Sequence, residues 1–341
     1  MVTIGNIGHK VGDAVHNLFD KTSGTIFVTG CTGVLTNRVA TRLLQAEYPK
    51  VRLGVQLHSE SEIATAEGFN KQGAELADFY WDREDTYEKA LRGVHTVFCS
   101  TPHNEDFPTQ FKAFLHACKK AGVQHIVKVS FYHNTWLGDE SRIPAQFRAT
   151  IQKVVPLVQK HVECDEALAK SGLHYIILGA SHLMSNPMLY QGQNLRKDAT
   201  PVHFYGASGG MGINYVSPND VAEVATRILL APKDFHGQDY SLTGPSAITD
   251  AQVAGLLSKY LEKEVRFINQ SLKEFEYGEE MSGNPAWLVA DLVGLEGIKA
   301  TGNEEVDGYV TDDIEKICGH GAETFEEYLM NTALMTPKEM A

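Results

Sequence analysis

A histidine and an aspartate stand four residues apart in the segment HVECDEALAKSG, as His161 and Asp165. In a helix this spacing places both side chains on one face, one turn apart. An imidazole titrates near neutral pH, so His161 could give a proton to an oxygen that gains negative charge, while Asp165 orients the ring. From spacing alone, a solvated pair on the surface of an amphipathic helix is the more common explanation.

Polar residues also follow the apolar run QHIVKVS, which ends at Ser130 and leads into Tyr132 and His133. The carboxyl ends of parallel strands are where α/β sheets hold ligands, so Ser130 or Tyr132 could hydrogen-bond a substrate oxygen. Side chains of a solvated loop are the alternative. No tyrosine has a lysine four residues later, so the common proton-donating pair, in which the lysine lowers the phenol pKa, is absent.

A glycine turn follows the apolar run TIFVTG and precedes a segment of helical periodicity. Gly30 and Gly33 allow a tight turn and let the backbone approach a diphosphate at a helix N-terminus. A third glycine is absent, because Thr36 takes that position. The turn predicts a dinucleotide site, with a purely structural turn as the alternative. Its candidate contacts are Gly30, Thr32, Gly33, Val34 and Leu35.

Cofactor choice is usually decided after the second strand, where an acid holds a ribose hydroxyl and an arginine holds a 2′-phosphate. Here Gln56 and His58 stand at that place, and they are neither. Arg38 could reach a 2′-phosphate or be a solvated helix residue, and Asp82 could accept from an adenine or cap the next helix. These residues leave the choice between NADPH and NADH open, and we favour NADPH. The candidate contacts outside the turn are Arg38, Gln56, His58, Asp82, Thr101, Pro102 and Ser130.

The elements that position these residues form a regular series. Helical periodicity alternates with short apolar runs at 25–30, 51–57, 74–81, 95–101, 124–130 and 174–180. This alternation predicts an α/β fold, a Rossmann-type doubly wound parallel sheet with a smaller α+β C-terminal substrate lobe. We expect an N-terminal extension with helical spacing at 1–24, an NAD(P)-binding domain at 25–182 with returns near 213–243, and the lobe mainly at 183–341.

Composition narrows the class of protein. The chain has 341 residues, and its hydrophobic content of 43% is ordinary for a globular protein. Its net charge of −13 disfavours binding to nucleic acid or to an anionic membrane surface. Five scattered cysteines make a disulfide framework or a metal site improbable and favour a reducing compartment, the cytoplasm. No run of about 18 apolar residues suggests a membrane span. We expect a monomer or homodimer with a small-molecule substrate.

The order and spacing of several blocks resemble the NmrA-like family of atypical short-chain dehydrogenases over roughly residues 25–330. These blocks are VTGCTG, AELADFYWDRED, KALRGVHTVF, ACKKAGVQHIVKVS, HVECDEALAKSGLHYIILGASHLMSN, NDVAEVATRILL and YSLTGPSAIT. The pattern is most similar to NmrA-like NAD(P)H quinone reductases and to isoflavone-reductase-like enzymes. The resemblance implies a Rossmann domain, a C-terminal lobe and a substrate cleft. The chain departs from the pattern at Thr36, Gln56 and Gly179.

The resemblance also bears on His161, because isoflavone-reductase-like enzymes carry a catalytic lysine at the matching distance from Gly172. It implies an NAD(P)H-dependent reductase of a small, apolar carbonyl, quinone, enone or imine, with His161 or a group in the Ser130–Tyr132 loop as proton donor. Two alternatives remain: a non-catalytic NAD(P)-sensing regulator that binds a protein, and a non-redox isomerase or cyclase that uses the same cleft.

Overall fold

The structure is a computed structural model that describes residues 24–56, 58–131, 155–195, 200–235, 238–300 and 308–332. The helix expected ahead of Thr25 and the loop residues Tyr132 and His133 lie outside these ranges. The chain divides into two compact units. The first comprises Met1–Ser130, Cys164–Leu178 and Ala222–Asp239, and the second comprises Phe131–Glu163, Gly179–Val221 and Tyr240–Ala341.

The main sheet has seven strands in the order β10-β6-β5-β4-β1-β2-β3, and the registers that join β3, β2, β1, β4 and β5 are all parallel. The order reverses between β1 and β4, which confirms the predicted Rossmann-type doubly wound sheet. Its strands are β1 Thr25–Val28, β2 Val51–Val55, β3 Glu75–Asp78, β4 Val94–Cys99, β5 His125–Phe131, β6 His174–Ala180 and β10 Gln238–Leu242.

Helices alternate with these strands as the sequence predicts, and the first one begins at Val34. Ser59 caps α3 by accepting from the backbone of Glu62, and Gly122 ends α5 in the left-handed conformation. The segments are α2 Val34–Gln45, α3 Glu60–Lys71, η1 Glu84–Thr86, α4 Tyr87–Leu91, α5 Phe107–Ala121, α7 Pro156–Ala169, α9 Pro218–Leu230 and η3 Pro232–Phe235.

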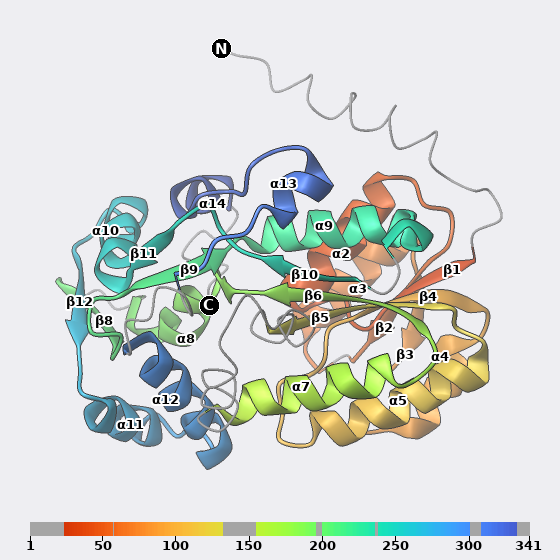
Figure 1. Ribbon diagram of the computed structural model, residues 1–341, viewed down its shortest axis with the longest axis horizontal. Coiled ribbons are helices and arrows are strands. Elements are labelled where there is room, and N and C mark those ends of the chain that lie inside the picture. Colours follow the sequence, from red (N-terminus) through yellow and green to blue (C-terminus); the bar gives the residue numbers. More distant parts are fainter. Residues whose placement is uncertain are drawn as a thin grey trace, which may run out of the picture. The chain divides into compact units, whose positions relative to one another are not determined.

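Figure 1 shows α2 and α9 over one face of the sheet and α4 and α5 over the other. Arg42 of α2 pairs with Glu223 of α9 at 3.4 Å. On the opposite face, the ring of Phe79 packs against Tyr87 of α4 and Phe114 of α5, with centroid distances of 5.5 Å. Both faces are therefore covered, as a parallel sheet of apolar strands requires.

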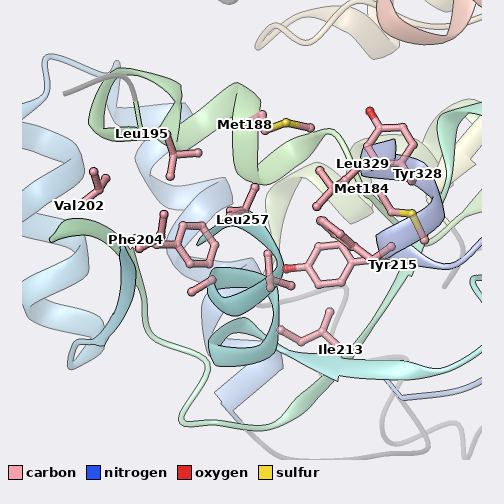
Figure 2. Packing of buried hydrophobic residues seen from close by; sticks show 14 residues of the cluster. Met184, Met188, Leu195, Val202, Phe204, Ile213, Tyr215, Leu257, Tyr328 and Leu329 are labelled. Atoms are coloured by element: carbon pink, nitrogen blue, oxygen red, sulfur yellow. The ribbon is translucent and has the colours of Figure 1, made fainter. Parts of the chain in front are cut away.

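The second unit is an α+β arrangement with a three-stranded sheet, β11-β9-β7, and a two-stranded sheet, β12-β8. Its strands are β7 His182–Leu183, β8 Val202–Gly206, β9 Gly212–Val216, β11 Ala247–Thr249 and β12 Val265–Asn269. Its helices are α8 Asn186–Leu195, α10 Asp250–Leu261, α11 Leu272–Met281, α12 Ala286–Ala300, α13 Asp313–Cys318 and α14 Phe325–Asn331. In Figure 2, buried residues from α8, β8, β9, α10 and α14 converge on one core.

Helix α10 begins with a reciprocal side-chain cap. Thr249 is the cap: its side chain accepts from the backbone of Gln252, whose side chain accepts from the Thr249 amide in return. This cap fixes Asp250 as the first residue of the helix, where it is almost fully buried. Among the helices of the described ranges, none has both the length and the apolar character needed to cross a bilayer.

Candidate functional site

A hollow of about 220 Å³ opens in the first unit at the carboxyl ends of β1, β2 and β4. This is the point where the strand order reverses, which is where doubly wound sheets place their ligands. Its lining residues are Thr29, Gly30, Cys31, Thr32, Gly33, Val34, Leu35, Thr36, Gly54, Gln56, Trp81, Ser100, Thr101 and Pro102. Eight residues expected to contact the cofactor are among them: Gly30, Thr32, Gly33, Val34, Leu35, Gln56, Thr101 and Pro102.

The floor of the hollow is the N-terminus of α2. Gly33 is its cap residue and contributes no side-chain hydrogen bond, and the first turn contains no acidic residue. The first amides of a helix have no partner within the helix and carry partial positive charge. The hollow therefore presents backbone donors to an anion, and its donor set fits the diphosphate of a dinucleotide.

Thr36, in the place of the usual third glycine, folds against the turn. Its hydroxyl donates to the Gly33 carbonyl at 3.2 Å. A Cβ atom at Gly33 would lie 3.0 Å from the Thr36 hydroxyl, and one at Gly30 would lie 3.3 Å from it. Thr36 therefore crowds the space that a side chain at either glycine would enter.

Two hydrogen-bonded links hold the edges of the hollow. The Thr29 hydroxyl donates to the Ser100 carbonyl at 3.2 Å and accepts from the Ser100 amide at 3.1 Å, which ties the end of β1 to the end of β4. The Asn37 side chain donates to the Cys31 carbonyl at 3.0 Å and fixes the glycine turn from the helix side. Burial, with a smaller effect of Glu62, raises the pKa of the Cys31 thiol to about 11, so the thiol is neutral at pH 7.

Trp81 is a wall of the hollow that the sequence did not reveal. It follows β3, is almost fully buried and packs edge-on against Phe79 and Phe114, with centroid distances of 5.1 Å. The Tyr87 hydroxyl donates to its carbonyl at 2.7 Å. An aromatic residue at the end of a predicted strand was the available signal.

Four of the expected cofactor contacts do not line the hollow: Arg38, His58, Asp82 and Ser130. The Arg38 guanidinium donates to the Val34 carbonyl at 2.9 Å, within its own helix. Asp82 is exposed, and the alternative of a helix cap at Asp82 is wrong, because α4 begins at Tyr87 with Thr86 as its cap residue. The His58 amide donates to Glu62 at 2.7 Å, and this bond leads the causes that lower the pKa of Glu62.

Ser130 and Asp165 belong to a buried polar cluster at the end of β5. The Lys128 ammonium, which has no exposed surface, lies 2.7 Å from one carboxylate oxygen of Asp165, and the Ser130 hydroxyl donates to the other at 2.5 Å. Lys128 also lies 5.7 Å from the centre of the Phe111 ring. Sequence reasoning missed Lys128, although a lysine inside the apolar run HIVKVS was a usable signal.

The charges of this cluster compensate one another inside the first unit. Burial raises the pKa of the neighbouring Cys99 thiol, which Lys128 counteracts only in part. A neutral thiol beside the ion pair adds no third charge. His161, the expected partner of Asp165, lies one turn earlier on α7 and is half-buried.

A model of the NmrA-like family matches residues 22–329 of the chain, which is most of its length. The chain belongs to the NmrA-like family. Membership agrees with the order of strands and with the glycine turn that opens the first βα unit.

Two curated relatives of this NmrA-like chain match almost end to end. The NAD(P)H azoreductase of Xenophilus azovorans is 27% identical over 303 residues, covering 89% of this chain and 96% of the relative. Quinone oxidoreductase 2 of Escherichia coli is 26% identical over 304 residues, with the same coverage of both chains.

Solved structures share the fold of the NmrA-like chain. The NADPH-dependent quinone oxidoreductase of Escherichia coli in complex with NADPH has a TM-score of 0.72 and 24% identity, covering 90% of this chain and 99% of its own. The triphenylmethane reductase of Citrobacter sp. has a TM-score of 0.70 and 20% identity, covering 91% of this chain and 100% of its own.

Proposed function

We propose that this chain is an NAD(P)H-dependent reductase of a small, apolar carbonyl, quinone, enone or imine substrate. The observation that carries the proposal is the hollow at the β1–β4 reversal, where the uncapped N-terminus of α2 meets the turn at Gly30 and Gly33. The family and the reductases among its relatives support the same activity.

In this proposal the amides of Val34 and Leu35 hold the diphosphate, and Gln56 lies beside the ribose end of the hollow. Thr101 and Pro102, after β4, flank the nicotinamide end. The cofactor supplies the hydride when bound. The protein's part is to bind and orient both reactants and to supply a proton to the reduced substrate.

We expect NADPH to be preferred, although two charged side chains oppose each other on this point. Arg38 lies on the first turns of α2 and favours a 2′-phosphate. Glu62 lies in the first turn of α3, close enough to Cys31 for its charge to raise the pKa of that thiol, and it disfavours a further anion. The preference depends on the balance between these two groups.

We choose among the candidate proton donors by asking which side chain has a proton to give to the substrate. The Ser130 hydroxyl donates to a carboxylate oxygen of Asp165, so it offers lone pairs to a ligand rather than a proton. Imidazole is the side chain that ordinarily exchanges a proton near neutral pH, so His161 remains the preferred donor, with Tyr132 as the alternative. Ser130 then holds the Asp165 carboxylate in place and does not donate to the substrate oxygen.

Thermal unfolding with NADPH and with NADH tests the cofactor site. A ligand at about 100 times its Kd stabilises the folded state by about 2.7 kcal/mol, so Tm should rise with NADPH. Absence of a shift with either nucleotide at millimolar concentration would reject the reductase proposal.

Oxidation of NADPH by 1,4-benzoquinone, followed by absorbance, tests the donor. His161→Gln should lower kcat by about 100-fold or more, with an unchanged Tm shift on NADPH addition. Glu163→Gln, an exposed neighbour on the same helix, is the matched control and should retain full turnover. If His161→Gln turns over normally, the proton comes from another group.

A further inference from the structure

The second unit contains its own pocket, lined by five aromatic rings from α8, β8, β9 and α11: Tyr190, Phe204, Tyr205, Tyr215 and Phe275. The remaining lining residues include His182, Glu279, Leu292, Leu295 and the charged residues described below. The pocket encloses about 70 Å³, which is room for a small chemical group rather than a fused ring system. Two of its rings, Tyr215 and Phe204, also pack into the core of this unit (Figure 2).

Two buried carboxylates form one end of this pocket. Asp250 is 2% exposed, and one of its oxygens accepts from the Tyr215 hydroxyl at 2.9 Å. Glu296 is 7% exposed and accepts from the Ala207 amide at 2.6 Å. A Cβ atom at Gly206 would lie 3.4 Å from the second oxygen of Asp250 and 3.3 Å from Glu296, so both carboxylates converge on the bare Cα of Gly206.

A single lysine faces these two acids. The Lys299 ammonium donates to the other oxygen of Glu296 at 2.6 Å, so both oxygens of Glu296 are engaged. Burial alone would lower the pKa of Lys299, but Glu296, Tyr215 and Asp250 hold it well above its ordinary value. The second oxygen of Asp250 has no hydrogen-bond partner among the described residues.

Acidic side chains outnumber basic ones around the pocket. Asp250, Glu296 and Glu279 line it together with Lys299 and His182, and burial raises the pKa of the Glu279 carboxyl. Burying a carboxylate oxygen that accepts no hydrogen bond costs folding free energy, unless a bound donor pairs with that oxygen. Aromatic faces also attract cations, because the ring quadrupole is negative above the plane.

We propose that this pocket binds the head of a compact organic cation, a protonated amine or an iminium that carries an N–H, which donates a hydrogen bond to the second oxygen of Asp250. The aromatic rings surround the carbon atoms of the head group, and the small volume excludes bulky cations. Binding itself does not require the reductase activity. Of these cations, only the iminium can accept a hydride, so its assignment as a substrate rests on the proposed function and singles out the imine among its substrate classes.

Three soluble probes of similar shape and different charge test the pocket: benzylamine, benzyl alcohol and benzoate. Isothermal titration at pH 7.5 on the protein without cofactor should give a Kd for benzylammonium at least about tenfold lower than for benzyl alcohol, and no binding of benzoate. Equal affinity for the amine and the alcohol, or tighter binding of benzoate, would overturn the proposal without any variant.

Asp250→Asn keeps an acceptor for Tyr215 and removes the charge, so the preference for the amine over the alcohol should disappear. Tyr215→Phe keeps the carboxylate and should retain the preference. Glu264→Gln, an exposed acid of the same unit that pairs with Arg266, is the matched control and should change neither affinity. A preference that survives Asp250→Asn in folded protein would place the cation elsewhere.

Addition of NADPH to the same samples separates this proposal from the reductase function. A Tm shift with NADPH but no preference for the amine would reject the cation pocket alone. A preference for the amine without any response to NADPH would reject the reductase function and leave the pocket standing.

Discussion

The hollow of the first unit and the pocket of the second are built from different parts of the chain and suit opposite charges. The hollow uses backbone amides at Gly33 and the first turn of α2, with no acidic residue in that turn. The pocket uses aromatic rings and the buried carboxylates of Asp250 and Glu296. Backbone amides suit the phosphates that every dinucleotide carries, because they are present whatever the residue types. Side chains differ from one sequence to another and can therefore suit one particular substrate.

The two units also treat a buried aspartate differently. Asp165 in the first unit accepts from Lys128 with one oxygen and from Ser130 with the other. Asp250 in the second unit accepts from Tyr215 with one oxygen, and its other oxygen lines a pocket. Both oxygens of Asp165 are therefore engaged within the protein, while the second oxygen of Asp250 is available to a ligand.

The largest expected effect is a difference in stability between variants of these two aspartates. Asp165→Asn leaves the Lys128 ammonium buried without its counter-charge and should lower the free energy of unfolding by about 3–5 kcal/mol. Asp250→Asn keeps its hydrogen bond and should cost only about 1 kcal/mol. Urea denaturation of both variants measures the difference.

A matched double variant checks that the cost comes from the unpaired charge. Lys128→Met with Asp165→Leu removes both charges at similar volume and should recover most of the loss, because apolar replacements of buried pairs are often neutral. Equal stability of the Asp165→Asn and Asp250→Asn variants would show that the two carboxylates do not differ in this way.

A smaller effect concerns the backbone donors of the hollow. Gly33→Val places a Cβ atom 3.0 Å from the Thr36 hydroxyl and projects a side chain at the entrance of α2. The affinity for NADPH should fall by about tenfold or more, which is about 1.4 kcal/mol, as measured by titration calorimetry. Gly68→Val, in α3 with open space around its Cα, is the control that should bind NADPH normally.

The smallest expected effect concerns two charged residues near the hollow, Glu62 and Arg38. Glu62→Gln removes a negative charge near Cys31, so the ratio of NADPH to NADH affinity should rise by about twofold to fivefold, the range of exposed charge interactions. Arg38→Gln should change the ratio in the opposite direction. Titrations with both nucleotides at two salt concentrations measure it, and a ratio unaffected by either variant would remove both residues from cofactor discrimination.

The elements and the glycine turn were predictable because they depend on local patterns. Ser59 and Gly122 mark helix ends by their own conformational preferences, and the strands are continuous apolar runs. Trp81 and Lys128 were missed because their roles depend on neighbours distant in sequence, Phe114 for one and Asp165 for the other. Spacing alone linked Asp165 to His161, since helical periodicity cannot report what approaches from a neighbouring strand.

The sequence by itself determined the alternation of strands and helices, the turn at Gly30 and Gly33, and hence the class of fold. Those features follow from periodicity and backbone preference, which act over a few residues. The tertiary structure decided which charges meet: Lys128 with Asp165, and Asp250 beside Glu296 around Gly206. Such pairs form only when strands and helices far apart in the chain pack together, because electrostatic partners are chosen by distance in space.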